Sequence, residues 1–168
     1  MPSPTAREAR TVEQQWAALV AEHPQSILLV DDEPDICESL KEILEATLPG
    51  VRVLTSNSGR EALDVLGREP VDLIIADYRM PGMDGLEFLR EAQQLQPRVP
   101  RFMITAYPDL ELAIRAINEA GVQKFVRKPI EPEISDYVRV VLLERQHGGL
   151  WDKSFAMKLP GRGERHRR

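Results

Sequence analysis

Four apolar runs of strand length recur along this chain, and each leads directly into polar residues. The runs cover residues 27–30, 73–76, 102–104 and 125–126, and the residues that follow them are Asp31-Asp32, Asp77, Thr105 and Arg127-Lys128. Segments with helical periodicity separate the runs, and this alternation predicts a parallel sheet with helices on both faces. The carboxyl ends of parallel strands share one edge, where ligands bind. Three aspartates, a hydroxyl group and a lysine are therefore predicted to converge at one site.

The same alternation can be followed through the whole central part of the chain. Apolar patterning and turn residues predict strands at 27–30, 51–55, 72–76, 101–105 and 124–126, and helices at 34–48, 59–66, 85–95, 110–120 and 131–145. Five such β-α repeats predict an α/β fold of the flavodoxin-like (βα)5 type, a doubly wound parallel sheet with strand order 2-1-3-4-5.

Two extensions flank this predicted core of residues 26–146. In the N-terminal extension, residues 1–25, apolar positions at helical spacing predict an extra helix over 6–22, which ends before His23-Pro24. This helix either packs on the core or serves dimerisation or signalling. The C-terminal tail, residues 147–168, is too short for a second domain.

The tail combines apolar and basic residues. From Trp151 onward it carries six Lys or Arg and two Asp or Glu, a balance of +4 within a chain whose net charge is −5. The tail either lies on the core, docks on a protein partner, contacts an anionic surface, or links to further chain. It is too short to read DNA by itself.

The residue types at the predicted site indicate phosphoryl transfer. Three neighbouring carboxylates repel one another unless a cation neutralises them, and Mg²⁺ prefers such oxygen ligands and bridges to phosphate oxygens. A carboxylate beside the ion, here Asp77, can attack a phosphoryl group and form an aspartyl-phosphate. Lys128 and Thr105 have the charge and the hydrogen-bond donor that the transferred group requires.

The order of these motifs resembles that of a known family. The Asp31-Asp32 pair, Asp77, the turn at residues 80–85, Thr105-Ala106 and Lys128-Pro129 occur in the order and at the spacing of a bacterial two-component response regulator receiver domain. The resemblance covers residue 26 to about residue 146. A single Asp-Asp pair would be weak evidence, whereas five elements in sequence are specific.

The resemblance implies a role for each matching residue. Asp77 would be the phosphoacceptor, and Asp31, Asp32, Asp77 and the backbone carbonyl of Arg79 would hold Mg²⁺. Thr105, Ala106 and Lys128 would bind the phosphoryl group, with a cis Lys128-Pro129 bond, and Thr105 and Phe125 would be the switch residues. The bulky Arg79 and Tyr107 would flank the path of the hydrolytic water and slow the loss of phosphate.

Several of these residues also suit ordinary structural roles. Asp31 and Asp32 are common helix-capping residues, Thr105 is a good strand residue, and Phe125 fits a core position as well as a switch. Cys37, the only cysteine, fits a small buried apolar residue better than a redox sensor.

The expected function is that of a phosphorylation-dependent switch and not that of an enzyme in the ordinary sense. A sensor histidine kinase, a histidine phosphotransfer protein or a small acyl phosphate would phosphorylate Asp77, and the change would alter contacts with a downstream protein. The chain then acts alone, passes phosphate along a phosphorelay, or forms the receiver portion of a longer regulator. A homodimer that forms on phosphorylation is a further alternative. A flavin carrier is disfavoured because the loop at residues 31–34 is acidic and would repel phosphate.

Composition fits a cytoplasmic protein with these properties. The net charge of −5 gives no indication of direct nucleic-acid binding. No apolar run approaches the roughly 20 residues that span a bilayer, the start lacks the apolar core of a signal peptide, and one cysteine cannot form an internal disulfide.

Overall fold

The computed structural model describes residues 11–146. The predictions for the first residues of the N-terminal helix, 6–10, and for the tail, 147–168, lie outside the described residues. No helix in residues 11–146 combines the length and apolar character that crossing a membrane requires.

The core is a five-stranded parallel sheet in the predicted order β2-β1-β3-β4-β5. The strands are β1 (Gln25–Val30), β2 (Val51–Ser56), β3 (Leu73–Asp77), β4 (Arg101–Thr105) and β5 (Lys124–Arg127). In β3 and β4 every residue is buried, which explains why these strands read as continuous apolar runs. The predicted flavodoxin-like topology is confirmed.

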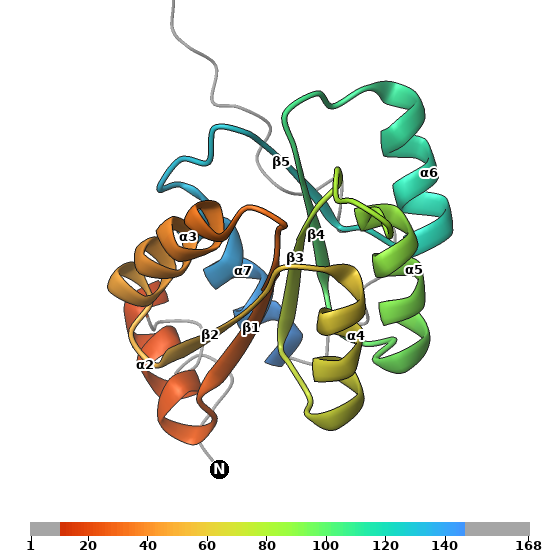
Figure 1. The fold of residues 1–168 in the computed structure, drawn as a ribbon. Helices are drawn as coiled ribbons and strands as arrows, with labels where there is room; N and C mark the ends of the chain where they lie inside the picture. Colours follow the sequence, from red (N-terminus) through yellow and green to blue (C-terminus); the bar gives the residue numbers. More distant parts are fainter. Residues whose placement is uncertain (1–10, 147–168) are drawn as a thin grey trace, which may run out of the picture.

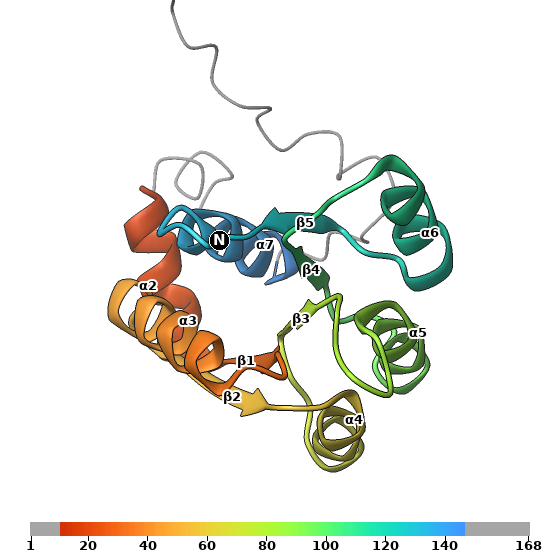
Figure 2. The ribbon, with the colours of Figure 1, turned by 45° about the horizontal axis from the view of Figure 1, so that its top comes forward.

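Helices cover both faces of the sheet, as Figures 1 and 2 show. They are α2 (Val12–Glu22), α3 (Pro34–Thr47), α4 (Gly59–Arg68), α5 (Gly85–Leu95), α6 (Leu110–Ala120) and α7 (Ile134–Gln146). One apolar cluster joins the sheet to α4, α5 and α6, and the other joins it to α2, α3 and α7. The sheet is thereby buried on both sides, and its carboxyl-end edge is left to the connecting loops.

The extra helix α2 packs on the core, as one of the two interpretations of the sequence expected. Thr11 begins it with a capping box, in which its side chain and that of Gln14 each accept from the other residue's backbone N–H. The buried Trp16 donates its indole N–H to the carbonyl of Pro49 at 3.0 Å. Beside it, Gly50 has a φ of +84°, and a Cβ at this position would meet Val20.

Within the described residues, three element boundaries differ by two residues or more from the sequence-based expectation, and others differ by one. Strand β1 begins two residues early, because the backbone N–H of Gln25 bonds the carbonyl of Gly50. Helix α4 continues past Gly67 to Arg68, and its last turn closes between Glu69 and Val65. Helix α7 begins at Ile134 and not at residue 131. Pro132 disfavours helical backbone at residue 131, and the chain then makes tighter i→i−3 turns, in which the N–H of Ile134 bonds the carbonyl of Glu131.

Candidate functional site

Three carboxylates meet at the carboxyl-end edge of the sheet. Asp31 directly follows β1 and Asp77 ends the neighbouring strand β3, so strand pairing sets them side by side. Each of the two aspartates, together with Asp32, offers a carboxylate oxygen, and these oxygens lie within 4.8 Å of one another. Asp31 and Asp77 are buried and Asp32 is half-buried. The convergence that the sequence predicted is therefore present in the structure.

Lys128 reaches this cluster from the end of β5. Its Nζ lies 3.2 Å from Oδ2 of Asp31 and 3.0 Å from Oδ1 of Asp77. Its backbone N–H donates to the carbonyl of Thr105 at 3.0 Å, and the Lys128–Pro129 bond is cis, as expected. Burial lowers the pKa of Lys128, but its hydrogen bond to Asp77 and the charges of Asp31 and Asp77 outweigh burial and raise the pKa overall. The ammonium group therefore stays charged at neutral pH.

The charge of the cluster fits a divalent cation. Burial raises the pKa of Asp77, the hydrogen bond to Lys128 opposes this, and the nearby charge of Asp31 adds to it. Three carboxylates face one ammonium group, so the ionised cluster keeps an excess of negative charge. Hard oxygen ligands at this spacing suit Mg²⁺. The cluster is an acidic triad of the kind that holds Mg²⁺ in receiver domains.

The loop from Tyr78 to Gly85 folds back over the end of β3. Gly82 adopts a φ of +77°, where glycine is favoured. The backbone N–H of Gly85 donates to the carbonyl of Tyr78 at 2.7 Å, and a Cβ on Gly85 would collide with the carbonyl oxygen of Asp77. An open pocket forms beside this loop, lined by Asp32, Tyr78, Arg79, Met80, Pro81 and Asp84. Through Asp32, this pocket adjoins the acidic cluster.

Thr105 lies at the end of β4, and its side chain is turned to its own loop. Its Oγ1 accepts a hydrogen bond from the backbone N–H of Tyr107 at 3.2 Å, and the residue is buried. Ala106 and Tyr107 are exposed. The guanidinium group of Arg79 lies over the Tyr107 ring, 5.5 Å from its centroid. The two bulky residues that the sequence singled out are therefore in contact with each other.

Phe125 lies on β5, opposite Met103 of β4. Its side chain is half-buried and packs against the cluster formed with α4, α5 and α6. This position suits both the core and the switch interpretation.

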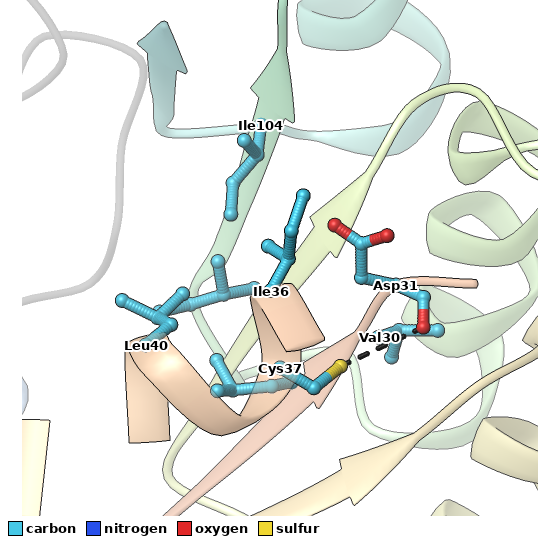
Figure 3. Close-up of a pocket in the computed structure, with 8 residues that line it drawn as sticks. Val30, Asp31, Ile36, Cys37, Leu40 and Ile104 are labelled. Carbon is cyan, nitrogen blue, oxygen red and sulfur yellow. Dashed lines mark hydrogen bonds between the residues drawn. The ribbon is translucent and has the colours of Figure 1, made fainter. Parts of the chain in front are cut away.

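Beneath the acidic cluster lies a small, mainly apolar pocket, shown in Figure 3. Cys37 is 4% exposed there, and its thiol lies 3.6 Å from the backbone carbonyl of Asp31, while the Asp31 carboxylate points away from it. Burial and then the charge of Asp31 raise the pKa of Cys37 to about 11. The expectation of a buried, small apolar residue is confirmed.

One supporting residue was missed by the sequence argument. Asn57 follows β2, and its Nδ2 donates to the carbonyl of Asp31 at 3.1 Å. A polar residue directly after a strand was the signal for the other site residues. Applied to the predicted strand 51–55, the same rule leads to Ser56, and Asn57 is the residue after it. Asn57 holds the loop that carries Asp31 and Asp32.

Comparison with known proteins agrees with this geometry. Residues 27–137 match the response regulator receiver domain family. The CheY-like receiver domain protein of Methanospirillum hungatei JF-1 has 32% identity and a TM-score of 0.70, covering 74% of this chain and 98% of that one. The receiver domain of an HD domain-containing protein from Pseudomonas fluorescens Pf-5 has 30% identity and a TM-score of 0.69, covering 76% of this chain and all of that one.

Curated relatives are much longer than this chain. The hydrogenase transcriptional regulatory protein HoxA of Cupriavidus necator is 40% identical over 115 residues, which are 68% of this chain and 23% of HoxA. The transcriptional regulatory protein GlrR of Escherichia coli K12 is 41% identical over 110 residues, 66% of this chain and 24% of GlrR. The chain thus spans about a quarter of the relatives' length. With its topology, its acidic triad and the match over residues 27–137, the chain belongs to the response regulator receiver domain family.

Proposed function

We propose that the protein accepts a phosphoryl group on Asp77 in a Mg²⁺-dependent reaction and thereby switches its contacts with other proteins. The observation that carries this proposal is Lys128, whose ammonium group lies within ion-pair distance of both Asp31 and Asp77. A cation placed between a nucleophilic carboxylate and a cation-binding carboxylate is suited to compensate the negative charge of an incoming phosphoryl group.

Each residue has a task in the proposed reaction. An Asp77 carboxylate oxygen attacks phosphorus, the bond from phosphorus to the donor's nitrogen or oxygen breaks, and the donor leaves with the bonding electrons. Lys128 then pairs with the phosphoryl oxygens. Asp31, Asp32, Asp77 and the Arg79 carbonyl would hold Mg²⁺, which when bound offsets the charge of the carboxylates and of the phosphoryl group. Hydrolysis of the acyl phosphate restores Asp77.

The proposed switch begins at Thr105. Its hydroxyl now accepts from the Tyr107 N–H. A phosphoryl group on Asp77 offers acceptor oxygens, so the Thr105 hydroxyl turns to donate to them, beside the small Ala106, and loses its contact with Tyr107. Phe125, half-buried on the adjacent strand, would follow. The phosphoryl group thus biases an equilibrium between two states.

The proposed phosphodonor is a sensor histidine kinase or a histidine phosphotransfer protein. An apolar groove runs from α3 to Lys128, lined by Ile36, Ser39, Leu40, Ile43, Lys128, Pro129 and Ile130. Its continuity with Lys128 supports docking of an amphipathic donor helix there, with the phosphohistidine directed at Asp77. We propose that this reaction takes place in the cytoplasm.

What the phosphorylated receiver acts on depends on whether it works alone or as part of a longer protein. HoxA and GlrR are named transcriptional regulatory proteins, and this chain covers only their receiver-length part. We therefore propose a receiver core at residues 26–146, extended by residues 1–25 and by a tail or linker at 147–168. It acts through a downstream protein, as a phosphorelay shuttle, or as the receiver portion of a longer regulator.

Incubation of the chain with acetyl phosphate and Mg²⁺, followed by intact mass measurement, tests the proposal. The wild type should gain one phosphoryl group, and neither Asp77→Ala nor the wild type with excess chelator should gain it. Equal gain in Asp77→Ala would overturn the assignment of Asp77. No gain in any sample, with acetyl phosphate and a histidine phosphodonor both tried, would overturn the phosphoacceptor function.

A further inference from the structure

A buried arginine stands at the amino end of β4, opposite the end that carries Thr105. Arg101 is 3% exposed. Within residues 11–146 no ion pair includes it, although an arginine in a protein interior normally has a carboxylate partner. Burial lowers its pKa to about 10, so the side chain is still charged at neutral pH. A buried charge of this kind requires compensation from other groups.

Backbone carbonyls provide that compensation, and they come from two separate segments. Nε donates to the carbonyl of Ala120 at 2.8 Å and Nη2 to that of Gly121 at 3.4 Å, both at the C-terminal end of α6. Nη1 donates to the carbonyl of Val99 at 2.7 Å and to that of Pro97 at 3.5 Å, in the loop before β4. A positive charge at a helix C-terminus is also favoured by the helix dipole.

The end of α6 is shaped to receive this guanidinium group. Gly121 has a φ of +58°, and a Cβ on it would lie 2.7 Å from Nη2 of Arg101 and 3.2 Å from Nε2 of Gln93. Arg101 also receives support through its backbone, because its N–H donates to Oε1 of Gln123 at 2.6 Å. The C-terminal end of α6 is therefore fixed to the base of β4 by several hydrogen bonds.

The N-terminal end of α6 is held far less firmly. Residues 106–111 are all exposed, and the side chains of Leu110 and Ile114 are 76% and 50% exposed. Leu112 is the one buried side chain in the first half of the helix. This end is connected to the site by the short loop in which Tyr107 donates to Thr105. In Figure 1, α6 lies at the side of the molecule, connected to β4 and β5 by its two loops.

We propose that Arg101 is a positioning residue that anchors the C-terminal end of α6 to the base of β4, so that α6 pivots about this end. The inference rests on the proposed function, because phosphorylation supplies the displacement. When Thr105 gives up its contact with Tyr107, the change falls on residues 106–114 and moves Leu110 and Ile114, while Ala120 and Gly121 stay in place. Without the anchor the whole helix shifts, and the movement is no longer confined to its exposed N-terminal half.

Hydrogen exchange measured by mass spectrometry, with and without Mg²⁺ and beryllofluoride as a phosphoryl mimic, tests this pivot. In the wild type the mimic should change exchange at residues 106–114 and leave 117–122 unchanged. In Arg101→Met, exchange at 117–122 should be about tenfold faster even without the mimic, since hydrogen bonds to a charged group are lost. The mimic's effect should then spread over the whole helix. Arg98→Met, which removes an exposed arginine from the loop before β4, should behave as the wild type.

Arg101→Lys completes the experiment, because it keeps the positive charge and removes the planar guanidinium group with its several N–H donors. It should give intermediate exchange at 117–122, and it replaces Arg101→Met in the comparison if that variant does not fold. Unchanged exchange at 117–122 in the folded Arg101 variants, or a wild type in which the mimic alters both ends of α6 equally, would overturn the pivot. Intact mass after treatment with acetyl phosphate, and separately with a histidine phosphodonor, is measured in parallel. If the wild type is not phosphorylated, the proposed function fails, whereas the anchor is still judged from exchange without the mimic.

Discussion

Individual residues at the site owe their reactivity to the charge and burial around them, and Cys37 shows this most simply. Its thiol is buried beside the carbonyl of Asp31, and its pKa is raised from 9.0 to about 11. Because the folded state holds the thiol proton more tightly than the unfolded state, this group makes folding less favourable as pH rises from 9 toward 11.

The reaction of the Cys37 thiol with a disulfide reagent should therefore be slow in the native protein, and its pH dependence should move to higher pH. In the native protein the rate with a disulfide reagent should keep rising with pH until about 11, whereas in denaturant it should level off near 9. Rates measured by absorbance at a series of pH values check this. A native rate that levels off near pH 9 would show that the thiol is not buried as described.

The contact between Arg79 and Tyr107 predicts slow loss of phosphate. We propose that these two bulky side chains, one lying over the other, obstruct the path of water to Asp77. Arg79→Asn combined with Tyr107→Glu should open this path and speed hydrolysis by about tenfold, or about 1.4 kcal/mol of activation free energy. Decay of the phosphorylated mass with time measures it, with Arg115→Asn as the matched control. Decay that is unchanged or slower in the double variant would contradict the role of these side chains.

At the scale of the elements, α2 is expected to be part of the cooperative fold although it precedes the family match. Leu19 is 3% exposed in the cluster that joins α2, α3 and α7 to the sheet. Leu19→Ala should lower the free energy of unfolding by about 2–5 kcal/mol, the usual effect of truncating a buried leucine. Val12→Ala, at a side chain that is 46% exposed on the same helix, is the control. Urea unfolding that gives equal stability for both variants would mean that α2 is dispensable.

Helix α4 carries a glycine that no contact requires. Gly67 lies in its last turn, is exposed, and has open space where a Cβ would be. Since its φ is not positive, alanine fits without strain, and Gly67→Ala should raise the free energy of unfolding by about 0.5–1 kcal/mol. Thermal and urea unfolding measure the gain. Gly121→Ala is the opposite control and should be destabilised, because its φ is +58° and Arg101 occupies the space.

The elements also show which features a sequence reveals. Parallel strands buried on both faces read as unbroken apolar runs, so β1, β3 and β4 and the polar residues at their ends could be predicted. The start of α7 could not be predicted from periodicity alone, since tight turns over residues 131–135 precede it. The structural role of Arg101 could not be predicted from the sequence either. Its partners are backbone carbonyls up to 20 residues away in the chain, and no side-chain pattern marks them.

For the whole molecule, strand order turns scattered residues into one site. Because β1 and β3 are neighbours and β4 and β5 follow, the residues after these strands meet at a single edge. The sheet thereby separates two functions. The carboxyl-end edge holds Asp77 and Lys128, and the opposite end of β4 holds Arg101 and the fixed end of α6. In the proposed pivot, a change at the site therefore reaches the exposed end of α6 through the loop after Thr105, while the end that Arg101 holds stays in place.

The proposed function requires that Asp77, and no other group, carries the phosphoryl bond. This can be tested by phosphorylating the chain with acetyl phosphate and Mg²⁺, reducing it with borohydride, and sequencing its peptides by mass spectrometry. Borohydride converts an aspartyl-phosphate into homoserine, so we expect homoserine at position 77 and unmodified aspartate at Asp31 and Asp32. Homoserine at either of those positions, or a phosphorylated chain without homoserine at position 77, would contradict it.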